Sequence, residues 1–138
     1  MASGIARTLD LPDMGTVRDY LHLLTEDRRH LRTTTFRKVT GLSPSEMART
    51  LGVHRPRVYQ EDIPLEKAIK NRIVPLVQAA DLAYELLGRN SGKAIVWIMA
   101  PNSAFGGDSP FEVIMRGDGN TVVDFLLERS GKKAARAF

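Results

Sequence analysis

The sequence predicts an all-helical protein, and three observations support this fold class. Residues 65–87 carry apolar side chains at alternating steps of four and three, which is the spacing of one face of an α-helix. Two segments, Ser43-Pro-Ser-Glu46 and Ser109-Pro-Phe-Glu112, have the pattern of a helix start with a capping box and a first-turn proline. The apolar run 94–99 would suit a buried strand, but no partner strand is evident, so we expect a helix there.

The N-terminal part of the chain is expected to begin with an arm and a short helix. Residues 1–15 mix Gly, Pro, Ser and Asp without periodicity and predict a loose arm. Thr16 is then placed to cap a helix, with apolar residues following at helical spacing. A basic, threonine-rich segment at 28–38 leads into further helix around Phe36, and Gly41 breaks the chain. Residues 16–62 are thus expected to form one region.

Within that region, residues 43–60 fit a helix-turn-helix. The motif needs a small residue where two helices cross, and Ala48 occupies that position. It needs a residue that tolerates positive φ in the turn, which is Gly52. The apolar residues that would clamp the second helix against the first are Met47, Leu51, Val53 and Val58. This pattern resembles the motif of Xre-type repressors.

The second helix of this motif is the candidate DNA-binding element. Arg55 and Arg57 suit guanine edges or phosphates, Gln60 suits adenine, and Tyr59 and His54 suit backbone contacts. The motif usually has an apolar residue three positions after Val58, whereas this chain has Glu61 followed by Asp62. The helix is therefore expected to end near Gln60, with Ile63 taking over the packing. The alternative is a helix-turn-helix that only packs.

Charge is distributed unevenly along the chain, whose formal net charge is +4. Residues 28–57 hold eight Lys or Arg and one acid, whereas residues 61–131 hold seven basic and ten acidic side chains. The basic block favours a polyanionic partner at one end, although solvated charged faces would give the same pattern.

The C-terminal part is expected to be a helical region at 63–131 followed by a basic tail at 132–138. Pro75 either kinks the long helix or marks a restart. Gly88 is a natural stop for that helix. A last helix is expected to open at Asn120 or Thr121 and to close at Gly131.

The sequence predicts no catalytic, cofactor or metal site, so an enzyme is disfavoured. The chain lacks cysteine, and His22, His30 and His54 lack metal-ligand spacing. No nucleophile–base pair and no phosphate-binding glycine loop is predicted. Instead, Pro101-Asn102 is expected to form a turn after the apolar segment, and Gly106-Gly107 a turn between helices. The longest apolar run, 94–100, is too short to cross a bilayer, and no signal peptide is evident. We therefore expect a cytoplasmic protein without a membrane partner.

Residues 97–127 contain a motif of Trp, a spacer, Pro-Asn, a large apolar residue, Gly-Gly, Pro, a short helix, Gly and a final apolar helix. The residues that define it are Trp97, Pro101, Asn102, Phe105, Gly106, Gly107, Pro110 and Gly119. This motif resembles that of the toxin-binding domain of the Xre/MbcA/ParS antitoxin family. Phe105 stands where leucine is more usual. The resemblance extends upstream to about Leu42.

The resemblance implies an antitoxin whose partner is a RES-type toxin, an enzyme that consumes NAD. It also implies that the C-terminal domain covers the toxin active site and that the N-terminal region binds operator DNA, with a homodimer expected. Candidate toxin contacts are Asn102, Phe105, Phe111 and the tail residues Lys132, Lys133, Arg136 and Phe138. The alternative for the tail is a frayed terminus. The alternative function is a plain repressor whose C-terminal half only dimerises.

Overall fold

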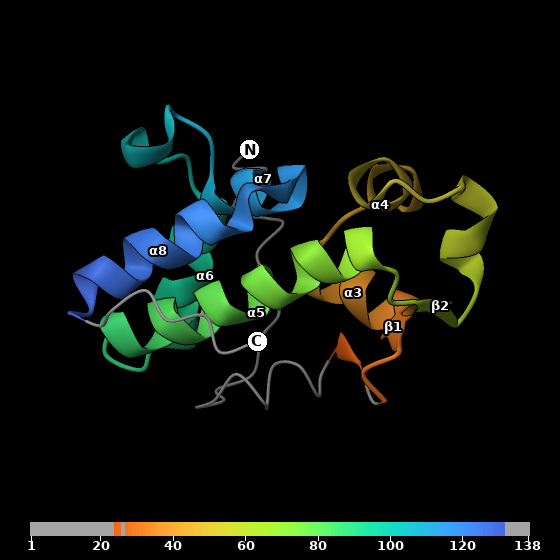
Figure 1. Cartoon of the computed structure of the whole chain (residues 1–138), viewed down its shortest axis with the longest axis horizontal. Coiled ribbons are helices and arrows are strands. Elements are labelled where there is room, and N and C mark those ends of the chain that lie inside the picture. Colours follow the sequence, from red (N-terminus) through yellow and green to blue (C-terminus); the bar gives the residue numbers. More distant parts are fainter. Residues whose placement is uncertain (1–23, 26, 132–138) are drawn as a thin grey trace.

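The computed structural model describes residues 24, 25 and 27–131, and this part of the chain is predominantly helical, as predicted (Figure 1). The expected arm, the helix start at Thr16 and the basic tail lie outside the described residues. The longest helix, α5 (Lys67–Leu86), runs through the middle of the molecule. Helices α6 (Ser91–Met99) and α8 (Gly119–Arg129) both pack against it. The predicted helix over residues 94–99 is thus confirmed.

The N-terminal part packs around the first turns of α5. Strand β1 (His30–Arg32) leads directly into α3 (Thr33–Thr40), and α4 (Pro44–Leu51) follows after a turn. The predicted second helix of the helix-turn-helix is a 3-10 helix, η1 (Arg55–Tyr59), and strand β2 (Asp62–Pro64) follows it. In Figure 1 these elements lie together at the end of the molecule where α5 begins.

A short antiparallel ladder between β1 and β2 is the exception to the all-helical prediction. His30 pairs with Pro64, Leu31 with Ile63 and Arg32 with Asp62. The central pair, Leu31 and Ile63, is fully buried, so the predicted packing role of Ile63 is confirmed. Three residues per strand are too few for an alternating pattern to stand out in the sequence, and the partner strand is remote along the chain.

The two predicted capping boxes and the predicted left-handed turn at Gly52 are confirmed. The Ser43 hydroxyl accepts a hydrogen bond from the Glu46 amide at 3.1 Å, and the Glu46 carboxylate accepts one from the Ser43 amide at 2.9 Å. Ser109 and Glu112 form the same reciprocal pair at 3.0 and 2.8 Å. Gly52 ends α4 in the left-handed conformation with φ of 67°. These local signals therefore determine where α4 and the helix after Ser109 begin.

Helix α5 is continuous through Pro75, so of the two predicted alternatives the helix does not restart there. The chain then passes through α7 (Pro110–Val113) and a segment (Ile114–Asp118) that kinks at Gly117, whose φ is 101°, into α8, one residue before the predicted start. At that start, a Cβ on Gly119 would lie 2.3 Å from the Cβ of Pro75. The absence of a side chain at Gly119 is what lets α8 cross α5 so closely.

One continuous cluster of buried apolar side chains joins the two predicted regions. It includes Phe36, Met47 and Val58 from residues 16–62 and Ile98 and Ile114 from residues 63–131. The N-terminal elements and the C-terminal helices thus share a hydrophobic core. Within the described residues, no helix has both the length and the apolarity that a bilayer crossing requires.

Candidate functional site

An apolar groove lies where the C-terminal ends of α5 and α8 meet the start of the loop after α6. Its volume is about 420 Å³. It is lined by Ala83, Leu86 and Leu87 of α5, Trp97 of α6, Asn102, Ser103 and Ala104 of the loop, and Phe125, Leu126 and Arg129 of α8. Leu86 is 36% exposed, which is unusual for a large apolar side chain. Arg129 is the one charged residue in the lining.

Three aromatic rings support this groove. Trp97 stacks on Phe125 with centroids 6.0 Å apart and an interplanar angle of 18°. Phe105 meets both rings edge-on, at 6.3 Å from Trp97 and 5.2 Å from Phe125. The Arg129 guanidinium lies 4.6 Å from the Phe125 centroid. Mutual packing of this kind restricts ring motion, so the groove has a rigid wall.

The loop that closes the groove is held by its own hydrogen bonds. The Asn102 carboxamide oxygen accepts from the Ala104 amide at 2.9 Å and caps a short 3-10 turn, η2 (Ser103–Phe105). The Asn102 amide donates to the Asp108 carbonyl at 3.1 Å. Gly106 and Gly107 follow with φ of 67° and 92°, which only glycine adopts readily. The predicted Gly-Gly turn is therefore confirmed, and Asn102 both shapes the loop and faces the groove.

The candidate toxin contacts predicted from the sequence do not share one surface. Asn102 lines the groove, and half-buried Phe105 supports it from within the aromatic cluster. Phe111 is 7% exposed and lines a different cleft, between α4 and α7, together with Leu42. Lys132, Lys133, Arg136 and Phe138 lie outside the described residues. The sequence analysis missed Leu86 and Phe125 because helical spacing alone cannot separate a core position from an exposed one.

The candidate DNA contacts on η1 are mostly exposed. His54, Arg55 and Gln60 face solvent, and Tyr59 is 62% exposed. Arg57 is half-buried, and its guanidinium lies 3.7 Å from the Glu66 carboxylate. Val58 is fully buried and anchors the segment. The exposed side chains are thus displayed on a short, fixed element.

Thr33 attaches the end of η1 to the start of α3. The Thr33 amide donates to the Glu61 carbonyl at 3.1 Å, and its hydroxyl donates to the Gln60 carbonyl. Thr33 is itself 1% exposed. These bonds direct the chain into β2 after Tyr59, so the segment cannot extend as an α-helix beyond this point.

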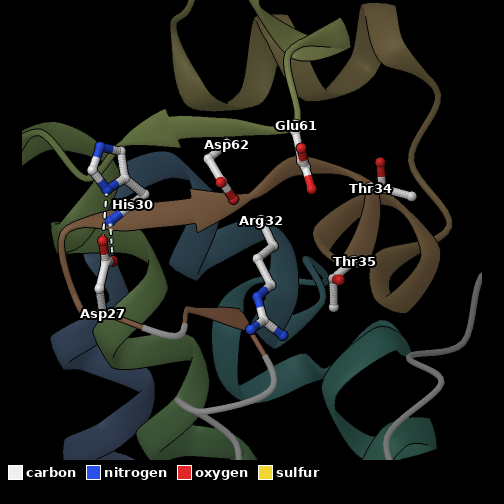
Figure 2. Close-up of a pocket in the computed structure, with 7 residues that line it drawn as sticks. All are labelled: Asp27, His30, Arg32, Thr34, Thr35, Glu61 and Asp62. Carbon is white, nitrogen blue, oxygen red and sulfur yellow. Dashed lines mark hydrogen bonds and ion pairs between the residues drawn. The ribbon is translucent and has the colours of Figure 1, made fainter.

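A polar cavity of about 440 Å³ lies beside this attachment point (Figure 2). Its lining combines three carboxylates with two cationic or ionisable side chains and two hydroxyls: Asp27, Glu61, Asp62, Arg32, His30, Thr34 and Thr35. Carboxylates outnumber cations, which disfavours a phosphate there. Within the described residues, no group of three or more His, Asp or Glu side chains is arranged to hold a metal ion.

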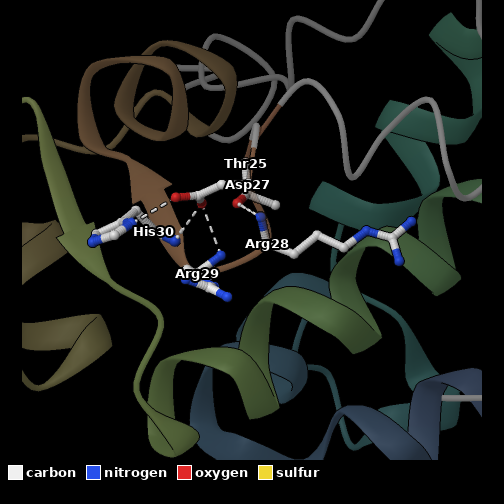
Figure 3. A network of polar contacts seen from close by, with 5 residues as sticks. All are labelled: Thr25, Asp27, Arg28, Arg29 and His30. Atoms are coloured by element: carbon white, nitrogen blue, oxygen red, sulfur yellow. Dashed lines mark hydrogen bonds and ion pairs between the residues drawn. The ribbon is translucent and has the colours of Figure 1, made fainter.

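The turn before β1 is ordered by Asp27 (Figure 3). One Asp27 oxygen accepts from the Arg29 and His30 amides at 2.8 and 2.9 Å, and the other lies 2.8 Å from His30 Nδ1. The hydrogen bond from the His30 side chain, followed by the one from the Arg29 amide, lowers the pKa of Asp27 to about 2. Arg28 in this turn has φ of 59°, and its amide donates to the Thr25 hydroxyl at 3.0 Å. The turn leaves Arg28 and Arg29 exposed.

Comparisons with protein-family models, with curated proteins and with solved structures find no match for this chain.

Proposed function

We propose that this protein is an antitoxin that neutralises a RES-type, NAD-consuming toxin by covering its active site. In this proposal residues 63–131 bind the toxin and residues 16–62 form a helix-turn-helix region that represses the operon in the cytoplasm. The motif in residues 97–127 supports the choice of partner. The observation that carries the proposal is the apolar groove beside Trp97, because it offers a rigid, partly exposed apolar surface for a protein partner.

Leu86 is the most direct point at which to test the groove. Its side chain is partly exposed, so replacement by lysine should leave the fold intact. A lysine there would be desolvated under a bound partner and would weaken binding. Tyr59→Lys is the matched control, because it also places lysine at an exposed large apolar position, on η1 and outside the groove lining.

The assay is co-expression with the neighbouring toxin gene, followed by co-purification of the two proteins. The toxin should be lethal alone and harmless with the wild-type chain. Leu86→Lys should restore toxicity and abolish co-purification, whereas Tyr59→Lys should keep both. If Leu86→Lys neutralises as well as Tyr59→Lys, the groove is not the toxin-binding surface.

Operator binding is tested separately by comparing two arginines of η1. Arg55 is exposed, whereas Arg57 faces Glu66 at 3.7 Å, so Arg55 is better placed to reach DNA. Five residues of 3-10 helix span only about 10 Å, so few side chains can enter a major groove. Arg55→Ala should weaken a sequence-specific gel shift by about 1–3 kcal/mol if it contacts guanine, and Arg57→Ala by less. Equal losses would argue against this arrangement.

The alternative function is a plain repressor, in which the groove is covered by a second copy of the chain. The two functions differ in what Leu86→Lys does to the free protein. The repressor function predicts that this variant turns a dimer into a monomer in light scattering. The antitoxin function predicts an unchanged oligomeric state and a lost toxin complex.

A further inference from the structure

A second cleft, lined by different residues from the groove, lies between the N-terminal half of α5 and the start of α8. Its volume is about 540 Å³. The polar groups in its lining are Lys67, Lys70, Asn71 and Gln78 of α5 with Gly117 and Asn120 of the opposite wall. The four α5 residues share one helix face, since their spacing follows the helical repeat. The opposite face of α5 carries the buried Ile69 and Ile73.

The charge of this cleft is uniformly positive. Lys67 and Lys70 are exposed and lie one helical turn apart, and no carboxylate of the described residues contributes to the lining. The neighbouring acids each lie beside an arginine: Glu66 lies 3.7 Å from Arg57, and Asp118 lies 3.5 Å from Arg116, which also pairs with Asp108 at 3.0 Å. This distinguishes the cleft from the cavity at His30, which holds three carboxylates. Within the described part of the chain, an anion in the cleft would therefore meet two ammonium groups and no lining carboxylate.

The walls of the cleft are fixed by backbone contacts. Gly119 approaches Pro75 so closely that a Cβ would lie 2.3 Å from the proline ring. Arg72 reaches across beneath the cleft, where its Nε donates to the Met115 carbonyl at 2.6 Å and its Nη1 to the Ala68 carbonyl at 2.7 Å. The Met115 bond holds the segment before Gly117 against α5, while the Ala68 bond lies within α5 and orients the Arg72 side chain. Lys67, Lys70, Asn71 and Gln78 on α5 thus lie across a preformed space from Asn120.

Pro75 leaves one backbone carbonyl of α5 without its helical partner. Because proline has no amide hydrogen, the carbonyl four residues earlier, that of Asn71, lacks its usual partner within the helix. The carboxamides of Asn71, Gln78 and Asn120 supply further donors and acceptors. Such groups suit the edge of a nucleobase or a sugar, while the lysines suit phosphate.

We propose that this cleft binds a nucleotide unit, with Lys67 and Lys70 on the phosphate and the carboxamides on the attached base or sugar. The unit is either a free nucleotide or part of a single nucleic-acid strand. Both sources share the same chemistry, and the site is independent of the groove and of η1. The proposal therefore stands whether or not the chain neutralises a toxin.

The test is a titration of the full chain, followed by NMR of the backbone amides at Gly117, Gly119 and Asn120. The probes are inorganic phosphate, AMP and a short oligothymidylate at millimolar concentration. Shifts with AMP identify a free nucleotide, and shifts with the oligothymidylate alone identify a strand. If none of the three probes moves these amides, the proposal is overturned.

Lysine variants provide the matched comparison. Lys67→Ala and Lys70→Ala should each weaken binding of the responsive probe about tenfold, the loss typical of one charged hydrogen bond. Lys93 is an exposed lysine on a different helix, α6, so Lys93→Ala should bind the probe as wild type does. If a nucleic-acid strand binds, each cleft variant should also reduce the magnitude of the slope of log K against log[salt] by about 0.7, because one phosphate contact is lost. Equal affinities of the Lys67, Lys70 and Lys93 variants would contradict the proposed site.

A carboxamide variant separates recognition of the nucleotide body from simple anion binding. Gln78→Ala should weaken AMP or the oligothymidylate, whichever binds, and leave inorganic phosphate unaffected. A Gln78→Ala protein that binds every probe as wild type does would overturn the assignment of the carboxamides to the base or sugar.

Discussion

Replacing Gly119 with alanine should destabilise the protein because α8 crosses α5 at this residue. The new Cβ would lie 2.3 Å from the Cβ of Pro75 and 2.9 Å from its Cγ. Carbon atoms pack at about 3.5 Å or more, so the first contact is about 1.2 Å too short. The proline ring is covalently closed onto the backbone and cannot rotate away. One helix must therefore shift relative to the other.

The expected size of the effect follows from two opposing terms. Overpacking of this severity costs about 3 kcal/mol, the upper part of the usual range. Gly119 has a helical φ of −57°, so alanine causes no backbone strain and contributes about 1 kcal/mol through helix propensity. The net loss is about 2 kcal/mol, or about 8 °C in Tm for a chain of this size.

Urea denaturation followed by circular dichroism measures this change. Gly92→Ala is the matched control, because Gly92 is an exposed residue of α6 whose Cβ would meet only the Asn90 side chain, at 3.3 Å. That variant should be as stable as wild type or slightly more stable. If Gly119→Ala is as stable as Gly92→Ala, α5 and α8 do not approach each other so closely at Gly119. The cleft lined by Lys67 and Lys70 would then lack the fixed walls that the proposed nucleotide site requires.

Two further predictions concern local hydrogen bonds. Ser109→Ala removes the hydroxyl that accepts a hydrogen bond from the Glu112 amide at 3.0 Å. The free energy of unfolding, measured by urea denaturation, should fall by about 1 kcal/mol. An unchanged midpoint would show that this cap contributes nothing to stability. Asp27 should titrate near pH 2 in carboxyl-carbon NMR, because its pKa is lowered to about 2 from 3.8, chiefly by the His30 hydrogen bond. Since the folded pKa is the lower one, its stabilising effect is complete above pH 3.8 and is lost as the pH falls through 2. His30→Ala should move the midpoint towards 3.8, and a wild-type midpoint already near 3.8 would refute the assigned cause.

The elements that the sequence predicted correctly depend on interactions between close neighbours in the chain. The reciprocal bonds of Ser43 with Glu46 and of Ser109 with Glu112 span three residues, so the residue types alone indicate them. The left-handed turn at Gly52 is confirmed for the same reason. The helix over residues 94–99 is also confirmed, but it was expected because no partner strand was evident. The resemblance to antitoxins and the functions it implies stay predictions.

Part of the candidate site could also be predicted from the sequence. The turn at Asn102, Gly106 and Gly107 was predicted from residue type, because a capping carboxamide and two left-handed glycines act locally. Exposed Leu86 and the Trp97–Phe125 stack were not predicted. Their positions depend on how α5, α6 and α8 pack, and each helix shows only its own apolar face in the sequence.

The sequence by itself thus determined where most helices begin and end, since caps, prolines and glycines act within a few residues. Only the tertiary structure decided that β1 pairs with β2, that the segment after His54 forms a 3-10 helix, and that Phe111 and Asn102 line different clefts. It also decided that Gly119 lies against Pro75. These features join segments remote along the chain, and their free energy comes from burial and packing that no local pattern encodes.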